Sequence, residues 1–182
     1  RVLYAGRLCR SKGVLDLIRA LGQFGIDELV SLKLLGSGPA RTEAEALSSN
    51  LGLTHRVNFI GAVPDITPFL RESNVLVLPS YAEGIPRVVM EAFAAGVPVI
   101  GTALPGIREL IEHELSGLLV PIADPLALAS ALQRIRENPG FAFHLAQRAR
   151  LLVCEKFSAQ RMAHDFENEY RSLCQQGEQK LS

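Results

Sequence analysis

Short apolar runs alternate along the chain with longer segments whose apolar residues recur at helical spacing. Runs of about four to seven residues rich in Val, Ile and Leu, bounded by Gly, Pro or polar residues, are typical of buried strands. The pattern predicts strands at residues 2–5, 29–35, 56–61, 75–78, 98–101 and 118–120. The sheet therefore has about six short strands, and a longer segment with helical spacing of its apolar residues separates most of them from the next.

The intervening segments carry apolar stripes that predict helices. They span residues 14–22, 40–51, 64–73, 87–95, 125–137 and 141–155. Ser158 is a suitable N-cap for one more helix. Its apolar stripe consists of Met162, Phe166, Tyr170 and Leu173. A polar tail follows at 177–182, so we expect one folded domain over residues 1–176.

Alternation of short strands and helices predicts an α/β protein with a parallel sheet covered on both faces. The right-handed crossover rule favours a doubly wound, Rossmann-like sheet with strand order 3-2-1-4-5-6. That order places strands 2–5 and 75–78 side by side at the switch point, where ligands bind beyond the carboxyl ends of the strands. The loops after these two strands are therefore predicted to carry ligand-binding residues.

Composition narrows the class of protein. The chain has 182 residues, 48% of them hydrophobic and 21% charged, with a formal net charge of zero. This describes an ordinary globular domain and does not indicate a nucleic-acid partner. Three widely separated cysteines, Cys9, Cys154 and Cys174, predict free thiols in a reducing compartment. The longest apolar stretch, 92–107, is interrupted by Gly and Pro and is not a membrane span.

The loop after the first strand, 6–13, contains Gly6, Arg7 and Lys12 and leads into a helix. It matches neither GxxxxGK nor GxGxxG. A close-approaching glycine, two cations and a helix N-terminus nevertheless suit a diphosphate, with each charge-assisted hydrogen bond contributing about 1.5–3 kcal/mol. Taken singly, such residues are more often solvated loop charges.

The loop after strand 75–78 carries Glu83, and Glu91 follows on the next helix. Pro86 suits the first helical position, because its missing N–H has no partner there in any case. Carboxylates at the mouth of an α/β sheet can accept hydrogen bonds from sugar hydroxyls. The alternative is a surface ion pair between Glu91 and Arg87, with Glu83 in solvent.

Several motifs together resemble a known family. They are Gly6-Arg7-Leu8 with Lys12-Gly13, Gly36-Ser37-Gly38-Pro39, Glu83 with Glu91-Ala92, the segment 95–100 and the segment 105–111. In this order, over nearly the whole chain, they resemble the C-terminal domain of family-4 glycosyltransferases with the GT-B fold. The pair Glu83/Glu91 fits the E-x7-E motif of that family. Ile85-Pro86-Arg87 replaces the Phe-Gly-Leu of many members and resembles a bacterial polysaccharide-type subset.

The resemblance implies a site for a nucleotide-sugar donor, with a UDP-sugar expected. Arg7 and Lys12 would hold the diphosphate and stabilise the departing phosphate, and Glu83 would face the donor hexose. Glu91 would take the ribose hydroxyls. The remaining donor contacts would come from Gly6, Gly84, Ile85, Pro86 and, near the base, Val63. The family is typically retaining and metal-independent, so we expect no metal or other cofactor.

The same resemblance implies that part of the enzyme lies outside this chain. The sequence begins at Arg1, directly in an apolar strand, so we expect a fragment whose missing part lies upstream. That part would be the N-terminal domain that binds a glycan or lipid-linked acceptor. We expect a cytoplasmic protein, peripheral at the membrane through the missing domain, and little transfer by this chain alone.

Two other kinds of function fit the sequence. A sugar-nucleotide epimerase or a phosphorylase could share the fold, although a phosphorylase would need a Lys-bound pyridoxal cofactor and the chain has only four Lys. A non-enzymatic partner-binding module could retain the sheet without the chemistry.

Overall fold

The computed structural model describes residues 1–24, 30–157 and 161 of the chain. Within this part, the strands form one parallel sheet in the order β3-β2-β1-β4-β5-β6. The strands are β1 (Val2–Ala5), β2 (Leu32–Leu35), β3 (Val57–Gly61), β4 (Val75–Leu78), β5 (Val99–Thr102) and β6 (Leu118–Val120). The predicted doubly wound sheet and its strand order are confirmed, with β1 paired to both β2 and β4.

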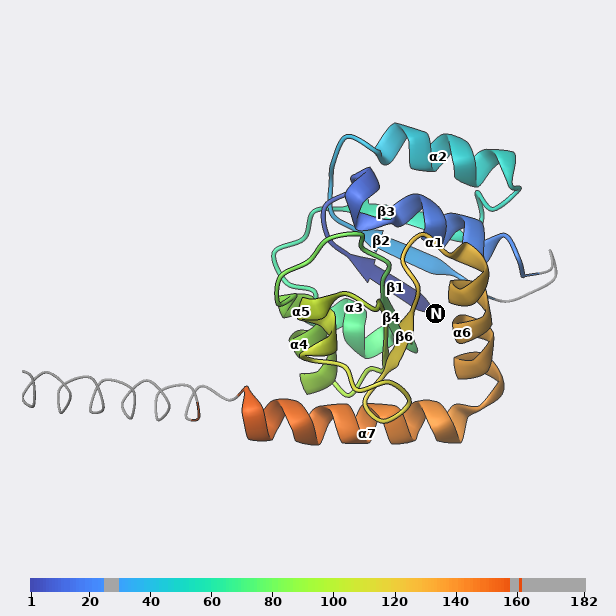
Figure 1. Cartoon of the computed structure of the whole chain (residues 1–182). Coiled ribbons are helices and arrows are strands. Elements are labelled where there is room, and N and C mark those ends of the chain that lie inside the picture. The colour runs from blue at the N-terminus through green and yellow to red at the C-terminus, as the bar shows by residue number, and fades with distance from the viewer. Residues whose placement is uncertain (25–29, 158–160, 162–182) are drawn as a thin grey trace, which may run out of the picture.

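Helices cover both faces of the sheet (Figure 1). They are the 3-10 turn η1 (Arg10–Lys12) and the helices α1 (Val14–Leu21), α2 (Arg41–Asn50), α3 (Thr67–Glu72), α4 (Arg87–Ala94), α5 (Pro105–Arg108), α6 (Pro125–Glu137) and α7 (Pro139–Lys156). Successive strand residues point to opposite faces, so Val2 and Tyr4 pack with α1, α2 and α6, whereas Leu3 and Ala5 pack with α3, α4, α5 and α7.

Several predicted boundaries were wrong by a few residues. β2 begins at Leu32 rather than 29, β5 covers 99–102 rather than 98–101, and α7 begins at Pro139 rather than 141. Pro86 is the N-cap residue of α4 rather than its first helical residue, because its backbone is extended at φ −79 and ψ 113. These offsets leave the two loops at the switch point where the sequence predicted them.

Two short elements were not predicted. The turn η1 lies in the loop 6–13 between the first strand and the first helix, and the four-residue helix α5 begins at Pro105-Gly106, where the sequence pattern predicted no helix. Ile107 of α5 is fully buried, and a Cβ on Gly101 of β5 would come within 2.9 Å of it. Tertiary packing therefore forms α5. The predicted helix from Ser158, with its apolar stripe and the polar tail, lies outside the described residues.

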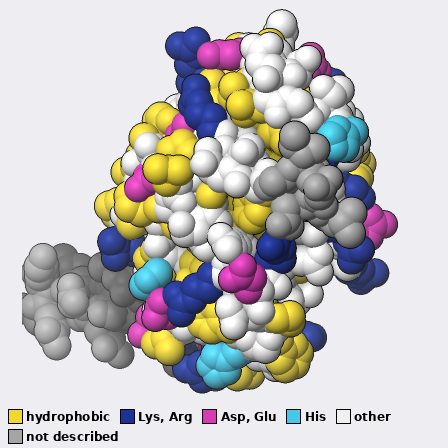
Figure 2. All heavy atoms as spheres, turned by 90° about the vertical axis from the view of Figure 1, so that its right-hand side faces the viewer, with side chains coloured by type: hydrophobic (Ala, Val, Ile, Leu, Met, Phe, Trp, Pro, Cys, Tyr) yellow, Lys and Arg dark blue, Asp and Glu magenta, His cyan; other side chains and the backbone are white. Residues whose placement is uncertain are grey.

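Charges of both signs are interspersed on the surface in Figure 2, which shows Lys and Arg among Asp, Glu and apolar side chains on that face. Across the described ranges, no helix combines the length and apolar character that crossing a bilayer requires.

Candidate functional site

Three loops meet where β1, β2 and β4 end. The φ of Gly36 is +123°, and a Cβ there would lie 1.9 Å from the carbonyl oxygen of Gly6. The φ of Gly13 is +66°, and a Cβ there would likewise lie 1.9 Å from the carbonyl oxygen of Pro79. A side chain at either position would collide with backbone, so these glycines allow the loops to pack directly on one another.

Lys12 and Glu83 form an ion pair across the switch point. The Lys12 Nζ lies 2.6 Å from the Glu83 Oε1, and the two side chains are only 28% and 12% exposed. Ser80 Oγ donates a hydrogen bond of 2.8 Å to the same Oε1. Within the described part of the chain, Oε2 of Glu83 has no such partner. One oxygen is therefore fixed and the other is open to accept a hydrogen bond.

A buried chain of hydrogen bonds supports this carboxylate. Ser80 is fully buried, and its carbonyl accepts a 2.6 Å hydrogen bond from the hydroxyl of Thr102, at the end of β5. Ser80 then holds Glu83. The position of Glu83 is thus set by the ends of two adjacent strands rather than by its loop alone.

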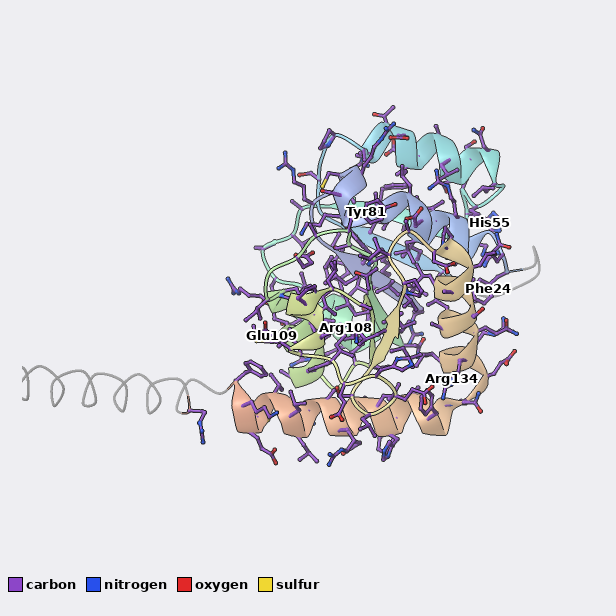
Figure 3. All side chains as sticks on the ribbon, viewed as in Figure 1. Phe24, His55, Tyr81, Arg108, Glu109 and Arg134 are labelled. Carbon is purple, nitrogen blue, oxygen red and sulfur yellow. The ribbon has the colours of Figure 1, made fainter. Side chains whose placement is uncertain are left out.

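Tyr81 links the loop that carries Glu83 to η1 and α1 through two hydrogen bonds. Its N–H donates to the carbonyl of Ser11 at 2.8 Å, and its hydroxyl donates to the buried carboxylate of Asp16 on α1. Figure 3 shows Tyr81 close to η1 and α1. The hydrogen bond to Asp16 raises the pKa of Tyr81, because the protonated phenol is the donor. The beginning of the loop that carries Glu83 is therefore held both by β5, through Ser80, and by η1 and α1, through Tyr81.

Arg7 is exposed on the loop that follows β1, five residues before Lys12. The hydroxyl of Tyr4 donates a 2.8 Å hydrogen bond to the carbonyl of Arg7, which fixes its backbone. Burial raises the pKa of this phenol well above its usual range, so Tyr4 stays protonated as the donor. In the described residues, the guanidinium of Arg7 has no ion pair or hydrogen bond. It is a cation available to a ligand.

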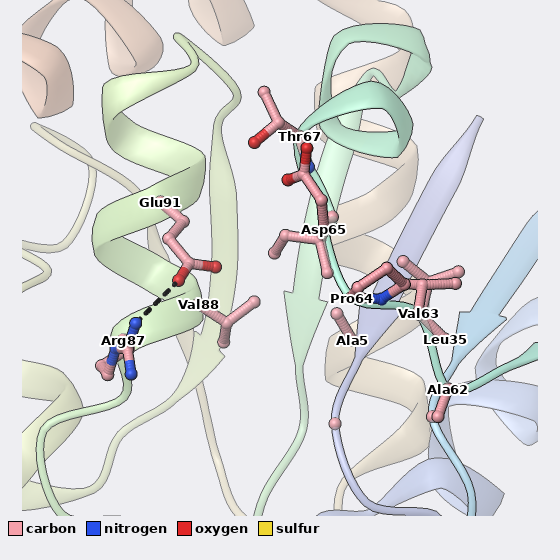
Figure 4. Close-up of a pocket in the computed structure, with 13 residues that line it drawn as sticks. Ala5, Leu35, Ala62, Val63, Pro64, Asp65, Thr67, Arg87, Val88 and Glu91 are labelled. Carbon is pink, nitrogen blue, oxygen red and sulfur yellow. Dashed lines mark hydrogen bonds and ion pairs between the residues drawn. The ribbon is translucent and has the colours of Figure 1, made fainter.

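A pocket of about 540 Å³ lies at the carboxyl ends of β1 and β2 (Figure 4). It is lined by the ends of β1 and β2, the segment after β3 and the first turn of α4. Gly6, Val63 and Glu91 are among its lining residues, in keeping with the nucleotide contacts that the resemblance implied for them. Asp65 also lines it, and the N–H of Thr67 holds the pKa of that carboxyl below its usual value.

Glu91 faces this pocket from α4 and has one ionic neighbour in the described residues. The Arg87 Nη2 lies 3.8 Å from the Glu91 Oε1, and the side chains are 87% and 44% exposed. The surface pair considered from the sequence is therefore present, but it is exposed and longer than a hydrogen bond. Such pairs contribute about 0–1 kcal/mol, so Glu91 is available to a ligand.

The predicted residues fall into two adjacent groups. Gly6, Val63 and Glu91 line the pocket, whereas Lys12 and Glu83 form the neighbouring ion pair. Arg7, Gly84, Ile85 and Pro86 lie on the loops between or beside these groups without lining the pocket. In the described residues, the N–H groups of Gly84 and Ile85 have no backbone or side-chain acceptor.

Four further residues build the site and were not singled out from the sequence: Asp16, Asp65, Ser80 and Tyr81. Asp65 had a readable signal, because an aspartate side chain commonly accepts a hydrogen bond from the backbone two residues further on, as it does here from the N–H of Thr67. The other three depend on contacts between residues far apart in the sequence. The Nδ1 of His113 accepts a 3.0 Å hydrogen bond from the N–H of Leu119, which indicates a structural role.

In residues 1–24, 30–157 and 161, no group of three or more His, Cys, Asp or Glu side chains is placed to bind a metal ion. The expectation that the site works without a metal stays a prediction. Cys9 and Cys154 are free thiols, and Cys174 lies outside the described residues.

The fold defines a Rossmann-like α/β domain with a crevice at the switch point of its sheet, and sequence comparison supplies the family. The chain belongs to the family described as Glycosyl transferases group 1, whose sequence model matches residues 1–138. A relative from Methanocaldococcus jannaschii, an uncharacterised glycosyltransferase, is 34% identical over 93% of this chain and 44% of its own length. The chain thus spans about half the length of the curated relatives it matches.

Two further proteins are similar to this chain. A lipopolysaccharide core biosynthesis glycosyltransferase of Rhizobium meliloti is 34% identical over 80% of this chain and 41% of its own length. The Anabaena protein HepE, solved with UDP, superposes with a TM-score of 0.89 at 26% identity, covering 94% of this chain and 48% of its own. HepE has also been solved with UDP-glucose. The predicted half of a GT-B glycosyltransferase is confirmed.

Proposed function

We propose that this chain is the donor-binding half of a retaining, family-4 type glycosyltransferase that transfers a hexose from a UDP-sugar to a glycan or lipid-linked acceptor. One observation supports the proposal above all. Two carboxylates, Glu83 and Glu91, flank the start of α4, and Lys12 from the adjacent strand end is paired with the first of them. Two hydroxyl acceptors and a cation at one crevice suit the hexose, the ribose and the diphosphate of such a donor.

The diphosphate would be bound by Arg7, Lys12 and the free N–H groups of Gly84 and Ile85. Arg7 contributes a guanidinium that has no other partner in the described residues. Lys12 keeps its ion pair with Glu83 and a 3.4 Å hydrogen bond to the carbonyl of Ala82, which leaves one ammonium proton for a phosphate oxygen. These donors are fixed before the reaction, so they can stabilise the negative charge that develops on the leaving diphosphate. The proposal needs no metal for this step.

The hexose would lie against Glu83. Its Oε1 is occupied by Lys12 and Ser80, which leaves Oε2 to accept hydrogen bonds from sugar hydroxyls. Because the carboxylate is held from β4 and β5, it can select the orientation of the sugar. This arrangement favours a role in positioning the hexose over that of a solvated loop residue.

The nucleoside would occupy the neighbouring pocket. Glu91 would accept the ribose hydroxyls, and the segment containing Val63 would flank the base. A volume of about 540 Å³ falls within the usual size range of ligand pockets, about 300–1,000 Å³. The complexes of HepE with UDP and UDP-glucose support a uridine donor here.

The acceptor would bind outside this chain. The relatives are about twice as long, and a glycosyltransferase needs a second substrate beside the hexose. We propose that the remaining part of the protein holds a glycan or lipid-linked acceptor, in keeping with the lipopolysaccharide relative. This chain alone would bind the donor and transfer little.

Calorimetric titration with UDP, GDP and ADP tests the donor site. We expect UDP to bind best, and Lys12→Ala to weaken it about tenfold, the loss of about 1.4 kcal/mol that a charge-assisted contact predicts. Lys33→Ala is the matched control, because Lys33 forms a similar ion pair with Glu72 outside the pocket.

Equal losses in Lys12→Ala and Lys33→Ala would show that the effect does not come from the crevice. Binding of none of the three nucleotides at millimolar concentration would favour a partner-binding module. Repeating the titration on the longer protein would then show whether the site needs the rest of the enzyme to close over it.

A further inference from the structure

In the sequence, Arg87 lies midway between Glu83 and Glu91, the two carboxylates of the site. It is the first residue of α4, four residues after Glu83 and four residues before Glu91. Its side chain is 87% exposed and lines the pocket beside Glu91, as Figure 4 shows. The spacing along the sequence indicated Arg87 only as a surface partner for Glu91.

The contact between Arg87 and Glu91 is too long and too exposed to be a strong ion pair. The nearest atoms are 3.8 Å apart, and no hydrogen bond joins the two groups in the described residues. An exposed pair of this kind contributes little to stability. Several other surface pairs of this chain are much closer, such as Arg41–Glu45 at 2.8 Å, which has the same spacing on a helix. The guanidinium of Arg87 thus keeps its donors open toward the pocket.

We infer that Arg87 is a third cation for the donor diphosphate, and that it exchanges Glu91 for phosphate when the donor binds. The inference rests on the proposed function. With the ribose on Glu91 and the hexose on Glu83, the two phosphates must cross the start of α4, where Arg87 stands. The planar guanidinium can bind phosphate oxygens through two hydrogen bonds, which an ammonium group cannot match in geometry.

This exchange couples the recognition of ribose and diphosphate. In the empty site, Arg87 partly neutralises the carboxylate of Glu91. When ribose hydroxyls occupy Glu91, Arg87 is released toward the phosphates, and each contact favours the other. A nucleoside without phosphates gains nothing from Arg87. The residue would therefore discriminate nucleoside diphosphates from nucleosides.

Titrations of this chain with UDP and with uridine, followed by NMR so that weak binding is measurable, test the inference. We expect Arg87→Leu to weaken UDP about tenfold, as for one charge-assisted contact, and to leave uridine unchanged. Arg87→Lys keeps the charge and should retain part of the UDP affinity. Arg148→Leu is the matched control, because it removes an exposed cation from α7, away from the pocket.

Three results would overturn the inference. Equal weakening of UDP and uridine would mean that Arg87 acts only by placing Glu91. An unchanged UDP affinity in Arg87→Leu would mean that the side chain stays in solvent. Loss of UDP affinity in the Arg148→Leu control would point to a general charge effect. If neither the wild-type chain nor the longer protein bound UDP or uridine, the proposed function itself would fail, which is a different outcome from any of these.

Discussion

The two oxygens of the Glu83 carboxylate have different surroundings, and this difference supports the proposed sugar contact. Oε1 is bound by Lys12 at 2.6 Å and by Ser80 at 2.8 Å. Oε2 has no hydrogen bond in the described residues. A carboxylate that was merely solvated would not need a buried serine behind it. The arrangement instead resembles a preorganised acceptor, whose orientation does not change when a ligand arrives.

Substitution of Ser80 tests this interpretation of a single residue. We expect Ser80→Ala to reduce the advantage of UDP-glucose over UDP about two- to tenfold, the range for losing one net hydrogen bond. The affinity for UDP alone should stay the same, since Lys12 is retained. Calorimetry with both ligands measures the ratio. Ser130→Ala, which removes an exposed hydroxyl bonded to Leu126 on α6, is the control.

A parallel loss of UDP and UDP-glucose affinity in Ser80→Ala would contradict a specific contact between Glu83 and the sugar. It would show instead that Ser80 supports the whole loop.

Among the secondary-structure elements, close backbone contacts between loops shape the site. Gly106 at the start of α5 lies against the loop before α4, and a Cβ there would come within 1.9 Å of the carbonyl oxygen of Gly84. The short helix α5 therefore packs directly against the backbone of the segment 83–86 and supports its position. Since Gly84 and Ile85 are proposed to donate to phosphate, their placement depends on this contact.

Gly106→Ala should displace that segment. We expect a loss of stability of about 1–3 kcal/mol, as for an overpacked site, together with weaker UDP binding. Gly140→Ala is the matched control, because a Cβ at that position in α7 would have no atom within 4 Å. That control should be neutral or more stable by about 0.4–1 kcal/mol. Thermal unfolding with and without UDP gives both quantities.

Normal UDP affinity in a stable Gly106→Ala variant would mean that α5 does not position the donor loop.

The sequence predicted the elements of the sheet well, because its strands are short apolar runs ended by Gly and Pro. The strand at 75–78 was predicted with its correct bounds, and the order of all six followed from the crossover rule. Helix α5 was missed because Ile107 folds onto β5, a contact that no local pattern contains. Elements that depend on tertiary packing are the ones that local periodicity cannot predict.

Several residues of the site could be predicted from the sequence, but the contacts between them could not. Glu83, Glu91, Arg7 and Lys12 stood out because motifs carry them. The ion pair of Lys12 with Glu83, and the bond from Tyr81 to the buried Asp16, join residues far apart in the sequence. Lys12 and Glu83 were predicted at one crevice, but with separate tasks. Their direct contact became visible only in the folded chain.

Over the whole molecule, the sheet presents two ends with different properties. The carboxyl ends of β1, β2 and β4 carry Lys12, Glu83 and the pocket of about 540 Å³. A second pocket, about 660 Å³, lies at the opposite end, beside Val2 and Val75 at the beginnings of β1 and β4. Its lining is mainly apolar, with Leu132 and Ile135, and also includes Arg1, Asn74 and Arg136. Volume alone would favour this second pocket. The carboxylates of Asp65 and Glu91 line the first pocket and can accept hydrogen bonds from ribose hydroxyls, which favours the first.

Mapping UDP binding onto the backbone amides of this chain by NMR shows at which end of the sheet the donor binds. We expect shifts concentrated at Gly84, Ile85 and Val63, at the carboxyl ends of the strands, with little change at Leu132 and Ile135. Shifts confined to Leu132, Ile135 and their neighbours would refute the proposed donor site, because they would place the nucleotide in the apolar pocket at the other end of the sheet.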